Sequence, residues 1–264
     1  MAANRLTAVD AQMFWMSARM PNDTFLLYGF DGVPADLDAA ISALITHAGT
    51  SPDLNRRVAD GSRWRYPRWV PHQVGTGQFI VHDLVDTSWR GCLAAVSALV
   101  DDQLDATVLP WRLHLFVGVQ GVPGTVDDAT VAVLQITHTL GGGGRTCGPA
   151  AVMFGGSASV DPVAPEHAHP VLLPWRSVQA ARTYRQLMRD TEAALVPPPA
   201  APCTPLRTNA SPVGRRLMRT VTRDRAQLCG TTVTVAALSA ISEALAGQLT
   251  KLGVEVGELG AEVT

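Results

Sequence analysis

Segments of strand length and of helix length alternate along the first half of the chain. Mainly apolar or alternating runs predict strands over residues 24–30, 78–82, 112–120 and 129–137, the first of them buried. The run at 129–137 is almost entirely apolar, which is typical of a central strand covered on both faces. A connector rich in glycine and proline joins it to 112–120, so these two runs predict a long hairpin.

Apolar residues recur at helical spacing between the strands and after them. Asp36 is placed to cap a helix that Gly49 ends, and another helix is predicted over 88–104. Further helices are predicted over 146–154, 175–195 and 232–252. Two weaker strands complete the pattern: 215–222, and 63–70, which Pro67 and Pro71 limit to a sheet edge.

This order of elements predicts an α/β protein with a mixed sheet. At 264 residues and 47% hydrophobic composition the chain is long and apolar enough to bury a real core. The proline-rich segment 196–210 predicts an extended crossover between two domains. We therefore expect domains at 1–195 and 211–264, the second of them only the start of a domain.

Charge and residue usage exclude several classes of function. The net charge is −2, which disfavours nucleic-acid binding even though 63–70 interleaves arginine with aromatic residues. Lys251 is the only lysine, so the chain has no P-loop lysine, and no lysine elsewhere for Schiff-base chemistry. The four cysteines lie far apart without zinc-ligand spacing, and we expect reduced thiols in a cytoplasmic protein and no metal.

Neither end of the chain carries a pattern for export or membrane insertion. Residues 1–16 contain Asp10 and Gln12 where a signal peptide needs an apolar run. The most apolar stretch, 233–249, is interrupted by serine, glutamate and glutamine. Any membrane contact is therefore expected to be peripheral.

One segment carries candidate chemistry, at the end of the predicted central strand. His138 follows 129–137 and precedes four glycines, 141–144, which let the backbone turn tightly and be approached closely. An imidazole there suits a general base, although a histidine that only bonds backbone at the turn explains the same pattern. A phosphate-binding loop is disfavoured, because Arg145 stands where a lysine is needed and no G-x-G-x-x-G follows a first strand.

From these residues the chain resembles the bacterial wax ester synthase/diacylglycerol acyltransferase family, especially its actinobacterial members. The resemblance rests on four segments in the family's order: LTAVDAQMFWMSARMPNDTFLLYGFDG, LPWRLHLF, LQITHTLGGGGRT and GTTVTVAALSAISEALAG. On the family's HHxxxDG signature, His138 is the second histidine and Gly143 the final glycine, while Thr137 and Gly142 replace the first histidine and the aspartate. Trp111 matches the tryptophan of the family's P-L-W segment.

The resemblance implies a CoA-dependent acyltransferase fold, of which this chain holds the N-terminal half and the start of the C-terminal half. It implies transfer of a long-chain acyl group from acyl-CoA to diacylglycerol or a long-chain alcohol. His138 would be the general base, no cofactor is needed, and Trp111 and Arg145 would lie along the substrate channel. The implied location is the cytoplasm, with peripheral contact at the inner membrane or at lipid inclusions.

Departures from the family pattern define an alternative function. Gly142 cannot hold the turn by pairing with an arginine such as Arg145, as the family's aspartate does, and family members run to nearly twice this length. The alternative is an inactive member that binds acyl chains or a partner subunit, with an oligomer or a second polypeptide completing the fold. Core packing is the preferred interpretation of Trp111 and of Phe14 and Trp15, and helix capping that of Asp10.

Overall fold

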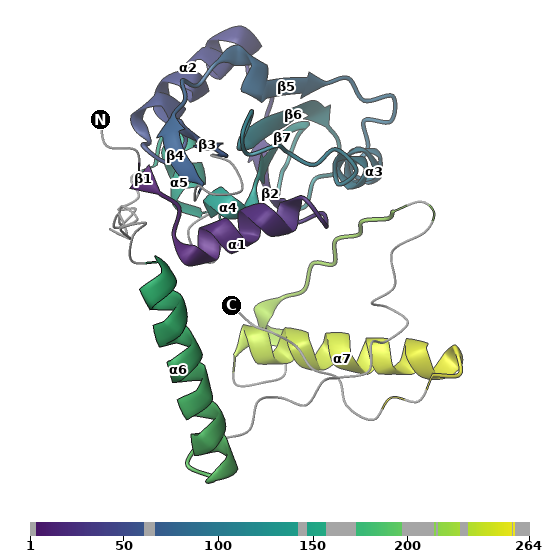
Figure 1. The fold of residues 1–264 in the computed structure, drawn as a ribbon. Coiled ribbons are helices and arrows are strands. Elements are labelled where there is room, and N and C mark those ends of the chain that lie inside the picture. Colours follow the sequence, from purple (N-terminus) through teal and green to yellow (C-terminus); the bar gives the residue numbers. More distant parts are fainter. Residues whose placement is uncertain are drawn as a thin grey trace. The chain divides into compact units, whose positions relative to one another are not determined.

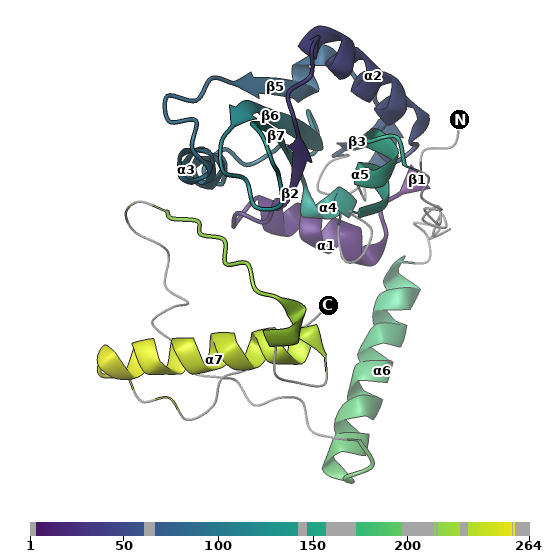
Figure 2. The same ribbon diagram turned by 180° about the vertical axis from the view of Figure 1, so that it is seen from behind.

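The computed structural model describes residues 4–60, 67–141, 147–156, 173–196, 214, 216–227, 232–254 and 256. The chain divides into two compact units. The first contains Met1–Glu166, Arg215–Val233 and Glu262–Thr264, and the second contains His167–Gly214 and Thr234–Ala261. Figures 1 and 2 show the elements of both units.

A four-stranded mixed sheet forms the centre of the first unit. Its strands lie in the order β2 (Thr24–Asp31), β7 (Ala129–Ile136), β6 (Trp111–Val119) and β5 (Phe79–His82). β7 pairs antiparallel with both neighbours, and β5 pairs parallel with β6. The expected α/β class with a mixed sheet, the β6–β7 hairpin and the buried, central β7 are all confirmed.

Helices cover both faces of this sheet. On one face α1 (Ala8–Ser17), α2 (Leu37–Thr50) and α5 (Cys147–Met153) pack over β-strand residues such as Leu113 and Leu134. On the other face α3 (Trp89–Leu99) places Cys92 and Val96 against Phe116 and Val131. Figure 1 shows α2 and α5 on one side of the sheet and α3 on the other. β7 is buried throughout because it is central and covered on both faces.

Caps and turns fix several element boundaries. Asp36 caps α2 as expected, and its Oδ1 accepts from the Ala39 backbone N–H at 2.9 Å. α2 nevertheless runs past Gly49 to Thr50, because a single glycine only weakens a helix. α3 begins after the Ser88 cap and ends at Leu99, five residues before the predicted end.

Two strands were predicted with the wrong position in their sheet, edge or centre. β2 lies at the edge of the sheet, so Leu27 and Phe30 are exposed rather than buried. Conversely, β4 (Arg68–Pro71) is the middle strand of a three-stranded sheet, between β1 (Asn4–Arg5) and β3 (Arg56–Ala59). The prolines permit this because one precedes the strand and the other ends it.

The described residues 216–222 of the predicted strand 215–222 do not form a strand. Residues 216–220, here called the 216–220 segment, instead lie along α3 within the first unit. The Trp89 Nε1–H donates to Thr220 Oγ1 at 2.8 Å, and Arg216 forms an ion pair with Asp101. Met218 packs against the cluster around Cys92. A short 3-10 helix, η5 (Arg225–Gln227), follows.

The second unit contains α6 (Leu173–Glu192) and all but the first residue of α7 (Val233–Lys251), both near their predicted positions. α7 is long and apolar enough to cross a membrane by length and composition alone, a property that core helices share. The predicted crossover 196–210 lies outside the described residues apart from Val196. The predicted division at 196–210 stays a prediction.

Candidate active site

The predicted catalytic residue, His138, follows shortly after the end of β7. Beyond its last residue, the Thr137 backbone N–H donates to the Pro110 carbonyl at 2.9 Å, which extends the pairing with the β6 side by one residue. His138 then begins α4 (His138–Gly141), and the Leu140 N–H donates to the Thr137 carbonyl at 2.9 Å. The histidine is therefore held at the end of the best-buried strand of the sheet.

The His138 side chain is partly exposed between two buried threonines. Thr137 and Thr139 are both 0% exposed, and neither hydroxyl has a hydrogen-bond partner among the described residues. Within the same described part of the chain, no hydrogen bond or ion pair engages the His138 imidazole. α1 packs against α4, as Figure 1 shows.

Trp111 occupies a core position on the sheet face opposite α3. It is wholly buried, its indole Nε1–H donates to the Leu54 carbonyl at 3.0 Å, and its ring meets Phe79 edge to face at a centroid distance of 5.7 Å. These contacts confirm the packing interpretation of Trp111. Its place along a substrate channel stays a prediction.

Other predicted residues have different outcomes. Gly142, Gly143 and Arg145 lie outside the described residues. Phe14 packs against the core as expected, but Trp15 is 52% exposed, because neighbouring helical residues point about 100° apart and only one can face the sheet. Asp10 is buried in the first turn of α1, whereas the cap itself is Thr7, whose Oγ1 accepts from the Asp10 N–H at 3.1 Å.

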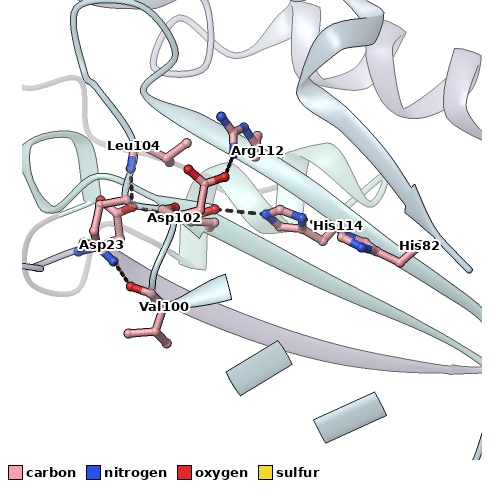
Figure 3. A network of polar contacts seen from close by, with 9 residues as sticks. Asp23, His82, Val100, Asp102, Leu104, Arg112 and His114 are labelled. Atoms are coloured by element: carbon pink, nitrogen blue, oxygen red, sulfur yellow. Dashed lines mark hydrogen bonds and ion pairs between the residues drawn. The ribbon is translucent and has the colours of Figure 1, made fainter. Parts of the chain in front are cut away.

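A network of buried and partly buried polar side chains lies on the α3 face of the sheet (Figure 3). His82 Nε2 and His114 Nδ1 are 2.9 Å apart, and His114 Nε2 lies 3.0 Å from Gln135 Oε1. Gln135 Nε2 donates to Asp23 Oδ2 and to the Asp102 carbonyl, both at 2.7 Å. The network thus connects β5, β6 and β7 with the residue before β2 and the turn after α3.

Further contacts hold the two aspartates of this network, Asp23 and Asp102. The Leu104 N–H donates to Asp23 Oδ2 at 2.8 Å, and Arg112 pairs with Asp102 at 2.6 Å. Burial raises the pKa of the Asp23 carboxyl, and the hydrogen bonds from Leu104 and Gln135 oppose that rise. The register of β2 on β7 pairs Thr24 with Ile136, so Asp23 stands beside the end of β7, the strand that precedes His138.

Burial also lowers the pKa of both histidines of the network. For His82 burial is the cause. For His114 burial is the largest cause, and Gln135 opposes it as an acceptor. Among the described residues, no group of three or more His, Cys, Asp or Glu side chains is placed to hold a metal ion.

Sequence reasoning did not single out Asp23, His82, His114 or Gln135. A usable signal was present for two of them, because His114 and Gln135 are polar residues inside runs that are otherwise almost entirely apolar. A polar side chain buried in a central strand needs a hydrogen-bond partner. Which partner it finds depends on strand register, which the sequence pattern leaves open.

Comparison with known proteins gives structural likenesses at low identity. No protein-family model matches the sequence. No curated protein matches it either. The wax ester synthase/diacylglycerol acyltransferase from Marinobacter aquaeolei VT8 is 21% identical, with a TM-score of 0.39, over 52% of this chain and 34% of that chain.

Two further solved structures are similar to a comparable degree. The first condensation domain of the calcium-dependent antibiotic synthetase is 13% identical, with a TM-score of 0.41, over 60% of this chain and 39% of that chain. The trichothecene 15-O-acetyltransferase from Fusarium sporotrichioides is 12% identical, with a TM-score of 0.41, over 58% of this chain and 34% of that chain. The chain therefore matches less than half the length of each of these structures, which include acyltransferases.

Proposed function

We propose that this chain is the histidine-bearing part of an O-acyltransferase that moves a long-chain acyl group from acyl-CoA to diacylglycerol or a long-chain alcohol. The observation that carries the proposal is the position of His138. Its imidazole is partly exposed, unengaged by described residues, and held at the end of the central strand in the segment that resembles HHxxxDG. Acyl-CoA and the hydroxylated lipid are the proposed partners, met in the cytoplasm or at a lipid surface.

The proposed reaction needs one proton carrier. Neutral His138 takes the proton of the acceptor hydroxyl while the oxygen attacks the thioester carbonyl. The new C–O bond forms, the C–S bond breaks, and the proton passes from the imidazole to the departing thiolate. The products are an ester and free CoA, and no acyl-enzyme forms.

The two motif departures bear differently on this proposal. Thr137 stands in place of the first histidine and is wholly buried at the strand end. A threonine there is compatible with catalysis by His138 alone. Gly142 removes a carboxylate from the turn, so the proposal requires the turn to hold its shape without that charge.

The test is thiol release from palmitoyl-CoA, with diacylglycerol or hexadecanol as acceptor, by the full chain. His138→Ala is expected to lower turnover about 10²-fold or more, the usual contribution of a general base. His72→Ala is the matched control, because His72 is a partly buried histidine beside the small sheet and outside the site. It is expected to retain native turnover.

Equal, background-level turnover by the native chain and His138→Ala would overturn the catalytic proposal. Calorimetric titration with palmitoyl-CoA then tests the alternative, an inactive family member that binds acyl chains. Acyl-CoA binding without turnover would favour that alternative.

A further inference from the structure

The hydrogen-bond partners of Gln135 fix the direction of the whole network in Figure 3. Its Nε2 faces the Asp23 carboxyl and the Asp102 carbonyl, and a carbonyl can only accept. Both amide hydrogens are thereby used, so Oε1 must accept from His114. His114 therefore carries its proton on Nε2.

The protonated nitrogen of His82 follows from that of His114. With Nε2 protonated, a neutral His114 presents a lone pair at Nδ1, and His82 Nε2 lies 2.9 Å from that atom. His82 must then donate from Nε2, which leaves its own Nδ1 as the free lone pair at the outer end of the network. Every hydrogen bond points inward, from His82 towards Asp23.

Only the outer histidine can exchange protons with solvent. His114 is 2% exposed, whereas His82 is partly exposed on the edge strand β5 and stacks on Phe116 at a centroid distance of 4.6 Å. A proton therefore enters at His82 Nδ1.

The coupled pair takes up protons differently from two separate histidines. A first added proton makes His82 a cation that still donates from Nε2 to His114. Alternatively the proton moves along the bond, and His114 then donates from Nδ1 to a neutral His82. A second proton places an N–H on both facing nitrogens, which abolishes the hydrogen bond and sets two cations side by side.

We infer that the His82–His114 pair is an acid-sensitive latch that holds the edge strand β5 on β6. The latch keeps its hydrogen bond through the uptake of one proton and loses it with the second. β5 has only four residues, Phe79–His82, paired with Leu113–Phe116 on one side, and the His82–His114 bond adds a side-chain contact at the last of these residues. The latch is independent of any catalysis by His138.

The charges around the pair favour the neutral state at neutral pH. Arg112 on β6 repels a proton on His114, while Asp102 in the turn after α3 attracts one but is paired with that arginine. α3 contributes the buried Cys92 thiol to the same layer, whose pKa burial raises to about 11, so it adds no charge. Asp23 lies beyond Gln135, and Asp83 is exposed just after β5.

Imidazole ¹⁵N NMR of the full chain tests the assignment without any mutation. At pH 7.5 His114 is expected to be protonated at Nε2 and bare at Nδ1, and His82 to be protonated at Nε2. On acidification the first step is expected to shift the signals of both rings together. A His114 proton on Nδ1 at pH 7.5, or two rings that titrate independently, would overturn the latch.

Amide hydrogen exchange tests whether β5 loosens when the His82–His114 bond is lost. In the native chain the protection of β5 amides, corrected for intrinsic rates, is expected to fall at least about tenfold as the second proton binds. His82→Phe keeps the stack on Phe116 but removes the bond, so β5 is expected to be poorly protected at every pH. His72→Phe is expected to behave as the native chain, and an acid step that survives in His82→Phe contradicts the inference.

Discussion

Gln135 connects three separate parts of the first unit through its side-chain amide. It is fully buried, and its amide group makes hydrogen bonds to His114, Asp23 and the Asp102 carbonyl. A buried amide in an apolar strand is costly unless each polar atom is paired, and here each is. This residue therefore connects the start of β2 and the turn after α3 to β7, the strand that precedes His138.

Replacing Gln135 with leucine is expected to destabilise the protein by about 2 to 4 kcal/mol, because Asp23 and His114 would remain buried without this partner. Urea unfolding at pH 7.5 measures the free-energy change. Gln120→Leu is the matched control, since Gln120 is exposed at the end of β6, and a change within about 0.5 kcal/mol is expected. Equal effects of the two substitutions would contradict the role given to Gln135.

The two described cysteines are expected to differ sharply in reactivity. Cys92 is wholly buried on the sheet-facing side of α3, and burial raises the pKa of its thiol to about 11, so almost no thiolate forms at pH 8. Cys147 is exposed at the start of α5. Iodoacetamide labelling followed by mass spectrometry should modify Cys147 and leave Cys92 intact until denaturant is added. Early labelling of Cys92 would show that α3 does not protect it.

At the residue scale, the sequence pattern singled out His138 as a candidate base, which stays a prediction, and it did not single out the polar network. His138 is detectable because a long apolar run ends at it and glycines follow, which is a local signal. Asp23 and Gln135 are 112 positions apart and meet only through the register of β2 on β7. Such a contact is a property of strand pairing, and no local pattern encodes it.

Among the elements, the 216–220 segment shows how a distant part of the chain completes the cover of the sheet. It lies on α3 through the Trp89–Thr220 hydrogen bond, and Met218 packs against the apolar cluster that α3 shares with the sheet. The segment pairs with no strand, so side chains and not a backbone ladder hold it. Its strand-like sequence was therefore a poor guide to its structure.

Substitution of Met218 is expected to expose this role. Met218→Ser should cost about 1 to 2 kcal/mol, because part of an apolar side chain is returned to water. Leu217→Ser, one residue earlier, changes a side chain that is 66% exposed and is expected to have little effect. Urea unfolding of the two variants measures the difference, and equal stabilities would show that the segment does not contribute through Met218.

Helices and central strands were predictable from sequence, while the placement of edges was not. β6, β7 and α2 have strong periodicity or a clear capping residue, and their boundaries agree within one or two residues. β2 and β4 were assigned the wrong environment, because whether a strand lies at an edge depends on which other strands pair with it. That choice is made by the tertiary fold.

For the whole molecule, the titrating groups predict an acid-sensitive stability. Burial lowers the pKa of His82 and His114, so the unfolded chain binds these protons at higher pH than the folded chain. The free energy of unfolding should therefore fall as the pH drops below about 6.5, by up to about 1.4 kcal/mol per pH unit for each proton. Asp23 has the opposite effect on stability at lower pH. Because its pKa is raised in the folded chain, the folded chain binds this proton at a higher pH than the unfolded chain does. Urea midpoints at pH 7.5, 6.0 and 5.0 check this, and a flat profile would contradict it.

The two units differ in how much apolar surface they bury. In the described parts of α6 and α7, only Ala236 and Leu249 are buried, while Tyr184 and Ile241 are more than 60% exposed. Exposed apolar side chains favour association when they gather on one surface. We therefore expect the chain to form oligomers whose size rises with protein concentration.

Light scattering during size-exclusion chromatography measures this association. Ile241→Glu places a charge on the exposed side of α7 and is expected to shift the population towards the monomer. Val85→Glu is the matched control, because Val85 is equally apolar and wholly exposed but lies in the first unit, after β5. A monomer at every concentration, or equal shifts towards the monomer in the two variants, would contradict association through α7. A charge should weaken association only where it lies in the contact between chains.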